Sequence, residues 1–194
     1  MARMFGRKVL MVVAGTFLVF APLAAAPPID DSPARFVATA VDMNRGAAGT
    51  VELIVNRWSS EADRDRLTTV MFDKGPEKLL DALQGMPRIG FFRTPGSIGW
   101  DIRFARHIPD ADGGERVLLV TDRRMSFREV ANRHRTVDYP FTVIELRLQK
   151  SGEGEGKVSV ATRIIPDKKN HLVTLENYEI QPVLLTSVRR ERTS

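Results

Sequence analysis

The sequence predicts a mainly β fold (α+β), either an antiparallel up-and-down β-barrel or a strongly curled sheet of about nine strands, with one inserted αα-hairpin. Three observations predict this fold. Short runs with apolar residues at alternate positions recur along the chain, and turn residues separate them at hairpin spacing. One stretch, near 60–85, changes to helical spacing. We therefore interpret residues 34–194 as a single β-rich domain that carries a helical hairpin.

Residues 1–26 have the pattern of a secretory signal peptide. "MARMFGRK" carries three basic side chains and no acidic one, and it precedes the apolar run "VLMVVAGTFLVF" and the small residues of "APLAAAPP". The apolar stretch Val9–Ala26 is short against the ~20 residues of a spanning helix, which favours cleavage near Ala24–Ala26 over a permanent anchor. The exact bond stays open, because Pro27 is a poor residue to follow a cut. We expect a periplasmic or secreted protein with no membrane span after signal removal.

The composition narrows the classes of function. The full chain has a net charge of +5, and removal of Arg3, Arg7 and Lys8 with the signal leaves 26 basic against 24 acidic residues, or +2. This small excess weakens the case for a polyanion partner, and we expect no nucleic-acid binding. The chain has no cysteine, which excludes disulfides, thiol catalysis and a lipid-modified cysteine after the signal. The mature domain therefore depends on core packing for its stability.

The mature chain is predicted to begin with a leader and a β-hairpin. We interpret residues 27–33, "PPIDDSP", as a short flexible leader. The runs "ARFVATAVD" and "TVELIVNRW" then carry apolar residues at alternate positions, as half-buried strands do. The stretch "MNRGAAG" between them contains glycine and suits a hairpin connection.

A helical hairpin is predicted over Ser60–Gly85. Ser60 with Asp63 forms a weak capping box, and the first turn is acidic, as the start of a helix prefers. Apolar residues then recur at helical spacing, at Leu67, Val70 and Met71. Gly75 and Pro76 end this helix and open a second one. We expect the pair to pack on the barrel or to cap one of its ends.

The β pattern resumes after the helices and continues along the rest of the chain. One segment, Arg123–Arg135, breaks the rhythm and is interpreted as a short helix or an ordered loop. Linkers with turn chemistry, such as "TPGSIG" and "DADGG", separate the runs. The predicted strands are Ile89–Arg93, Trp100–Ile108, Arg116–Thr121, Pro140–Gln149, Lys157–Ile165, His171–Tyr178 and Ile180–Arg189.

The strand Trp100–Ile108 mixes chemistry-bearing and apolar residues. Simple alternation assigns its residues to two faces, an inward one with Trp100, Ile102, Phe104 and Ile108, and a solvated one with Asp101, Arg103, Ala105 and His107. Asp101 and Arg103 are then ~6.6 Å apart at the α-carbon, close enough for an ion pair. His107 lies about 20 Å from Asp101 along the strand, so a partner for His107 has to come from an adjacent strand.

The favoured hypothesis is an exported, non-enzymatic binding module for an apolar or amphipathic small molecule. In a barrel with a cavity, the aromatic residues of the inward face line a pocket, whereas in a filled barrel they are core. Sequence alternation is the same in the two cases. The candidate ligand-binding residues are Trp58, Trp100, Arg103, Phe104 and His107.

Two alternatives stay open. The first is an envelope interaction or structural protein, which docks on a partner or an anionic surface through a basic cluster formed by Arg123, Arg124, Arg128, Arg133 and Arg135. The second is a hydrolase with a site around Asp101, Arg103 and His107. No catalytic residue is assigned, because the common serine-nucleophile signatures are absent. The three histidines are isolated, so we expect no metal site and no cofactor.

The segments "AVDMNRGAAGTVELIV", "GSIGWDIRFAR" and "DGGERVLLVTDR" together resemble a group of uncharacterised, signal-bearing bacterial proteins of similar size. The resemblance covers most of the mature chain. The group has no assigned activity, so no functional residue is carried over from it. The resemblance implies a bacterial envelope setting and nothing further about function.

Overall fold

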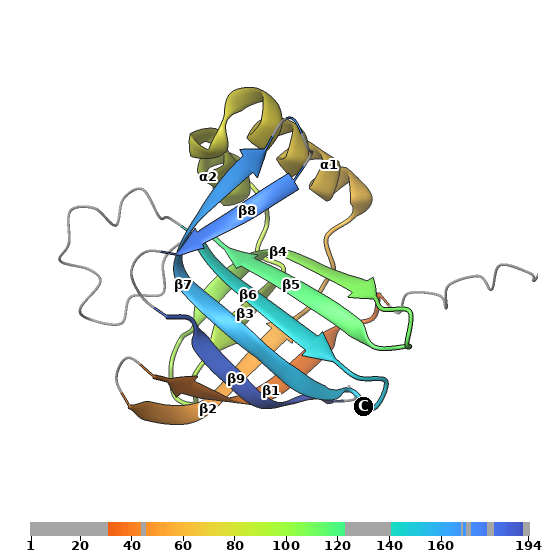
Figure 1. Ribbon diagram of the computed structural model, residues 1–194, viewed down its shortest axis with the longest axis vertical. Coiled ribbons are helices and arrows are strands. Elements are labelled where there is room, and N and C mark those ends of the chain that lie inside the picture. Colours follow the sequence, from red (N-terminus) through yellow and green to blue (C-terminus); the bar gives the residue numbers. More distant parts are fainter. Residues whose placement is uncertain are drawn as a thin grey trace, which may run out of the picture.

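The structure is a computed structural model that describes residues 31–43, 46–122, 141–167, 169, 172–177 and 181–191. These residues form nine β-strands, two α-helices and one π-helical turn (Figure 1). The helical elements are α1 (Glu61–Thr69), η1 (Val70–Lys74) and α2 (Pro76–Gln84). The strands are β1 (Ala34–Asp42), β2 (Ala47–Val55), β3 (Gly90–Arg93), β4 (Trp100–Pro109), β5 (Glu115–Thr121), β6 (Phe141–Leu148), β7 (Glu153–Asp167), β8 (Leu172–Asn177) and β9 (Val183–Glu191).

Eight of the strands close into an antiparallel barrel. Neighbouring strands pair in the order β6-β5-β4-β3-β2-β1-β9-β7, and β6 also pairs with β7, which completes the ring. β8 lies outside the ring and pairs with the second half of β7, Thr162–Asp167. β7 therefore belongs to the barrel through its first half and to a protruding hairpin through its second (Figure 1). The prediction of a mainly β barrel with a helical insertion is confirmed, with one of the nine strands outside the ring.

The inserted helices begin where the sequence predicts. The amide of Asp63 donates to the hydroxyl of Ser60 over 3.1 Å, and the amide of Ser60 donates to the Asp63 carboxylate over 2.9 Å, which completes the capping box. η1 continues α1 and ends at Gly75, whose φ of 96° favours glycine. α2 starts at Pro76, as the sequence predicts. Among the described residues, no helix has the length and apolar character needed to cross a membrane.

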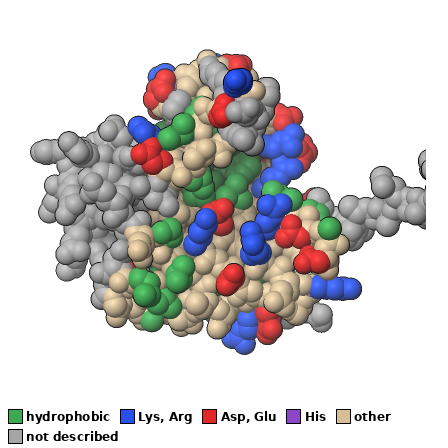
Figure 2. All heavy atoms as spheres, in the orientation of Figure 1, with side chains coloured by type: hydrophobic (Ala, Val, Ile, Leu, Met, Phe, Trp, Pro, Cys, Tyr) green, Lys and Arg blue, Asp and Glu red, His purple; other side chains and the backbone are tan. Residues whose placement is uncertain are grey.

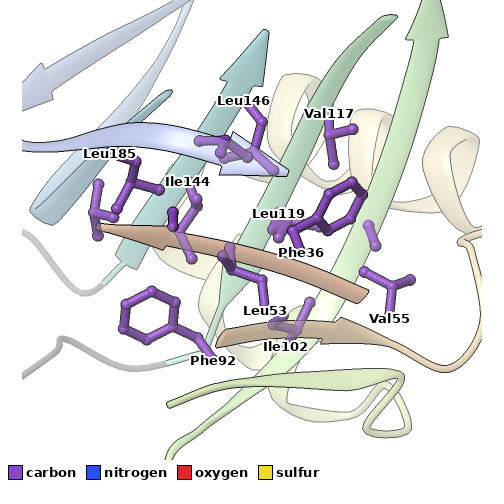
Figure 3. Packing of buried hydrophobic residues seen from close by; sticks show 14 of the residues in the cluster. Phe36, Leu53, Val55, Phe92, Ile102, Val117, Leu119, Ile144, Leu146 and Leu185 are labelled. Atoms are coloured by element: carbon purple, nitrogen blue, oxygen red, sulfur yellow. The ribbon is translucent and has the colours of Figure 1, made fainter. Parts of the chain in front are cut away.

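Apolar side chains fill the middle of the barrel. Phe36, Leu53, Ile102 and Leu119 have no exposed surface, and they meet residues from β6 and β9 in the interior (Figure 3). An eight-stranded barrel has an interior just wide enough for side chains to fill. The middle of this barrel is therefore packed core.

A second core lies between the helices and the outer face of the barrel wall. It explains why Phe141–Ile144 of β6 is buried at every position, since both faces of the strand are covered here. The described helices thus pack on the side of the barrel and not over either of its ends (Figure 1). The members of this outer core are Leu67, Met71, Leu79, Leu83, Met86, Phe104, Val120, Phe141, Val143 and Ile164.

A β-bulge interrupts β4 in the middle of the strand. Ile102 pairs with Thr121 of β5, and Phe104 pairs with Val120, so Arg103 is one extra residue on β4. A bulge of this kind shifts the alternation of side chains by one residue. Every residue of β4 after Arg103 therefore faces the side opposite to the one that alternation predicts.

The bulge overturns the predicted faces of the second half of β4. His107 pairs with Val117, an interior residue, so His107 lies inside the barrel and only 8% of its surface is exposed. Ala105 also faces the interior, whereas Phe104 packs in the outer core and Ile108 is exposed. The prediction that Phe104 and Ile108 share the inward face, with Ala105 and His107 on a solvated face, is wrong for this reason.

A second bulge in β9 has the same effect. The pairing of β9 with β1 shifts at Ser187, whose φ of 51° lies in the left-handed region. Leu185 faces the interior before the bulge, and Val188 faces it afterwards. Arg190 then pairs with Phe36, which is an interior residue, so the arginine side chain also points inward at the end of the barrel.

Candidate functional site

The two ends of the barrel differ in chemistry, and each is a candidate site. We call one the leader end: β1, β5 and β7 begin there, and it contains Trp58, His107, Glu115 and Arg190. We call the other the hairpin end, because the β1–β2 and β3–β4 connections lie there, next to Trp100. In Figure 1 the leader end is on the right and the hairpin end is at the lower left.

His107 is the centre of the leader end. Its Nδ1 lies 3.2 Å from a carboxylate oxygen of Glu115, and its Nε2 lies 3.2 Å from a carboxylate oxygen of Asp31. The imidazole stacks on the indole of Trp58, with ring centroids 4.2 Å apart and 22° between the planes. The sequence-based expectation that a partner of His107 comes from an adjacent strand is confirmed, since Glu115 is on β5.

Further contacts hold these groups in place. The second carboxylate oxygen of Glu115 accepts a hydrogen bond from Arg190 over 2.8 Å. The guanidinium of Arg190 lies over the ring of Phe36, 6.0 Å from its centroid. The indole N–H of Trp58 donates to the carbonyl of Ser32 over 2.9 Å. The leader end thus consists of oppositely charged side chains that are hydrogen-bonded to one another at one end of the apolar core.

The charges at the leader end shift two pKa values. Burial acts to lower the pKa of His107, but the hydrogen bonds to Glu115 and Asp31 and the negative charges of these groups outweigh burial, so the pKa is raised. The hydrogen bond from His107 lowers the pKa of Glu115, assisted by the charge of Arg190 and opposed by burial. Both ring nitrogens face carboxylate oxygens, an arrangement that only the doubly protonated imidazolium satisfies in full.

The hairpin end contains an apolar pocket of about 160 Å³. The indole of Trp100 forms one wall and lies 5.8 Å from the ring of Phe92, centroid to centroid. Apart from Asp42 and Thr94 at the rim, apolar residues and one glycine line it, namely Ala40, Ala47, Ala48, Gly49, Val51, Phe92, Trp100, Val158 and Val183. Within the described residues, the pocket forms the open mouth of the barrel, beyond the filled middle.

Exposed apolar side chains occupy both connections at the hairpin end. Met43, in the β1–β2 connection, is 62% exposed, and Ile98, in the β3–β4 connection, is fully exposed. Hydrophobic side chains gather at this end of the barrel in the view of Figure 2. Exposed apolar groups around an apolar pocket are typical of a binding surface.

Asp101 and Arg103 lie on the outside of the barrel wall. Arg103 lies 3.4 Å from Asp101, so the predicted ion pair is confirmed, and it lies 3.2 Å from Asp122. Arg103 also donates to the carbonyl of Met86 over 2.9 Å, which ties the end of the helical insertion to β4. His107 is inside the barrel, so the structure does not bring the three residues of the hydrolase hypothesis together.

The five predicted ligand-binding residues thus lie in three places. Trp100 lines the pocket of the hairpin end, Trp58 and His107 form the leader end, and Arg103 and Phe104 lie on the outer side of the wall. The predicted anionic-partner surface, Arg123, Arg124, Arg128, Arg133 and Arg135, lies outside the described residues. The hypothesis that rests on it stays a prediction.

Sequence reasoning missed two members of the leader end, Glu115 and Arg190. Glu115 faces inward because it pairs with Leu148, an interior residue of β6, although it follows a turn and resembles a solvated strand end. Arg190 falls in the charged stretch "VRRE", and only the bulge at Ser187 turns it inward. β5 and β9 are separated in the ring by β6 and β7, so no pairing of neighbouring strands pointed to the contact between Glu115 and Arg190.

A broad groove also crosses the outer face of the barrel. It has a volume of about 580 Å³ and lies over β5, β6, β7 and β9. Its walls carry both signs of charge, including Lys157, which lies 2.7 Å from Glu145, and Figure 2 shows acidic and basic side chains side by side on this face. Mixed charge gives no preference for an anionic partner.

Comparison of the chain with protein family models, curated proteins and solved structures gave no match. The proposed relation to exported bacterial proteins therefore rests on the three quoted segments. Within the described ranges, no group of three or more His, Asp or Glu side chains is placed to hold a metal ion. The two barrel ends remain the sites whose geometry bears on function.

Proposed function

We propose that the protein is an exported, non-enzymatic binding module that takes the apolar part of an amphipathic small molecule into the hairpin end of its barrel. The observation that carries the proposal is the apolar pocket beside Trp100, which opens to solvent between connections that expose Met43 and Ile98. Export belongs to the same proposal and is supported by the signal-like sequence of residues 1–26.

The filled middle of the barrel limits how deep a ligand can enter. Phe36, Leu53 and Ile102 occupy the space below the mouth. The pocket of about 160 Å³ is smaller than the ~300–1,000 Å³ of pockets that enclose a drug-sized ligand. The end of an alkyl chain or a single apolar ring fits this volume. The polar part of the molecule then stays outside, which favours an amphipathic ligand over a wholly apolar one.

The geometry of His107 supports binding over hydrolysis. A general base needs a free lone pair within reach of a substrate proton. Both ring nitrogens of His107 instead face carboxylates of the protein, and the ring is stacked and buried. Asp101 and Arg103 are engaged on the other side of the wall.

The two tryptophans allow a direct test, because the chain has no others and one lies at each end. In mature W58F protein, Trp100 is the remaining indole. Titration with sodium decanoate and with decyltrimethylammonium bromide is expected to change its emission saturably with either headgroup. W100F protein, which keeps Trp58, is the matched control and is expected to show no saturable change. An unresponsive W58F protein, or an equal response of W100F, would overturn the proposal.

A pocket-filling variant separates specific binding from surface adsorption. Ala40 lies in the wall of the pocket, so the larger side chain of Ala40→Leu reduces its volume. In the W58F background this variant is expected to lose at least about tenfold in decanoate affinity, the effect of roughly 1.4 kcal/mol of lost apolar contact. Near-ultraviolet circular dichroism checks that the fold is kept. Unchanged affinity in a folded Ala40→Leu protein would place decanoate elsewhere.

A further inference from the structure

The leader is attached to the barrel by two side chains of the leader end. His107 Nε2 lies 3.2 Å from the carboxylate of Asp31, and the indole N–H of Trp58 donates to the carbonyl of Ser32 over 2.9 Å. β1 begins at Ala34, so both contacts lie before the first strand and outside the barrel's ladder of hydrogen bonds. The two barrel groups that hold the leader are themselves stacked as one pair.

The contact with Asp31 depends on the proton count of His107. A neutral imidazole has one N–H donor and one acceptor nitrogen, whereas the imidazolium has two donors. In the structure one ring nitrogen faces Glu115 and the other faces Asp31. Both carboxylates therefore receive a hydrogen bond only while His107 is doubly protonated.

The surroundings decide which carboxylate loses its hydrogen bond on deprotonation. Glu115 has only 17% of its side chain exposed, and Arg190 holds its second oxygen. Asp31 has 78% of its side chain exposed, so water readily replaces its partner. A neutral His107 thus keeps its single N–H on Glu115 and turns the lone pair of Nε2 toward the Asp31 carboxylate. Two acceptors then face each other, and the contact becomes unfavourable.

The charged groups that face His107 come from three elements. Asp31 faces it from the leader and Glu115 from β5, while Arg190 faces it from β9 through Glu115. The two carboxylates are close enough to hydrogen-bond the ring directly, whereas the Arg190 guanidinium reaches the ring only through Glu115. These groups together stabilise the protonated ring. They raise the pKa of His107 above the ~6.5 of an ordinary histidine.

We propose that residues 31–33, the described end of the leader, are a pH-dependent strap, which closes the leader end of the barrel while His107 is protonated and is released when His107 loses its proton. Release frees Asp31 and Ser32 from the Trp58–His107 pair and uncovers that pair as an aromatic surface. The core below the pair, at Phe36, stays filled in both states. The strap acts at the leader end and does not depend on ligand binding at the hairpin end.

The strap can be followed in mature W100F protein from about pH 5 to about pH 9, around the range in which histidine titrates. A protonated imidazole quenches an indole stacked on it, so Trp58 emission reports the protonation of His107. Hydrogen exchange at the indole N–H of Trp58, which donates to the carbonyl of Ser32, reports the attachment of the leader once it is corrected for the intrinsic effect of pH. We expect Trp58 emission and exchange protection to change with one midpoint, and protection to fall about tenfold or more, as loss of a charge-assisted hydrogen bond predicts.

Asp31→Asn is the decisive variant, because Asp31 is exposed and precedes the first strand, so the substitution is expected to leave the barrel folded. It is expected to remove the pH dependence of exchange protection at the Trp58 indole N–H, while Trp58 emission still titrates through His107. Asp65→Asn, at an exposed position of α1, is the matched control and is expected to behave like the parent protein. Two results would overturn the strap: exchange protection at the Trp58 indole N–H that stays constant through the titration of His107, or a pH-dependent step in this protection that survives in Asp31→Asn.

Discussion

The two ends of the barrel are formed by the same eight strands but differ in what they present. The leader end holds paired charges, with His107 between Glu115 and Asp31, and Asp31 and Ser32 contact it from outside the barrel. The hairpin end presents an apolar pocket beside Trp100 and has exposed apolar side chains around it. One end is polar and closed, the other apolar and open.

The origin of the difference is local. At the hairpin end, strand alternation alone turns Trp100 inward. At the leader end, the bulges at Arg103 and Ser187 shift the alternation and turn His107 and Arg190 inward. One extra residue in each of two strands is therefore enough to give an apolar barrel a polar end. Buried polar groups need partners, and the three charges inside this end supply them to one another.

The largest expected effect tests the core that separates the two ends. Phe36→Ala removes a fully buried ring that also lies under Arg190, and it is expected to lower the free energy of unfolding by about 3–5 kcal/mol. Urea denaturation measures the loss. Ile98→Ala, at a fully exposed position, is the control and is expected to cost less than about 0.5 kcal/mol. Equal losses in the two variants would mean that the middle of the barrel is not packed.

The next effect tests the charge network of the leader end. Glu115→Gln takes away the carboxylate shared by His107 and Arg190, and we expect a loss of about 1–3 kcal/mol near pH 6. Because folding raises the pKa of His107, its contribution to stability is complete below the unfolded pKa of ~6.5 and is lost as pH rises through the folded pKa.

Urea denaturation at several pH values checks this sign. The parent protein is expected to lose stability across that pH range, and Glu115→Gln is expected to lose less of it. Glu155→Gln, at an exposed position of β7, is the control and should follow the parent curve. A parent protein whose stability rises with pH over the same range would contradict the assignment of His107 as the titrating group.

A smaller effect tests whether the two ends act independently. Trp100→Ala is expected to cost about 1–2 kcal/mol, less than the core variant, because the ring is only partly buried. About 23 Å of β4 separates Trp100 from His107. The effects of substitutions at sites this far apart on the free energy of unfolding usually add. The double variant with Glu115→Gln is therefore expected to be additive within about 0.5 kcal/mol in urea denaturation, and a larger coupling would show that the ends communicate.

The smallest effect lies at the start of the helical insertion, two residues after Trp58. Ser60→Ala removes the hydroxyl that caps α1 and is expected to cost about 1 kcal/mol. Thermal unfolding measures the loss, while the emission of Trp58 and Trp100 in the folded state is expected to stay the same. A change in either emission would mean that the helical insertion influences the barrel ends, contrary to its position on the side of the barrel.

Much of the fold could be predicted because it follows from periodicity. The alternation in "TVELIVNRW" and the capping pair Ser60 and Asp63 are local signals, and the structure has a strand and a helix start at these places. The faces of β4 could be predicted only as far as Arg103. A bulge leaves no mark in the hydrophobic pattern here, since Phe104 finds apolar surroundings in the outer core just as it would inside the barrel.

The contacts of the leader end could not be predicted from local sequence patterns, for another reason. Asp31 meets His107 across 76 positions of sequence, and Arg190 meets Glu115 across 75. Such contacts depend on the order and register of all the strands between them, and one residue of slip reverses every side chain. The inward position of Trp100 could be predicted, because Trp100 precedes the bulge. Simple alternation is therefore enough to place it in the wall of the pocket.

The pairing of β1 with β9 has a consequence for how the chain folds. Arg35, at the start of the ring, pairs with Glu191, which is 156 positions later, so the last strand of the barrel closes onto the first. Until β9 has been synthesised, β1 and β7 each keep an unpaired edge. Long-range pairing of this kind slows folding and exposes strand edges to aggregation. The barrel is thus a structure that a growing chain cannot close until β9 has been made, and a chain cut before β9 is expected to aggregate.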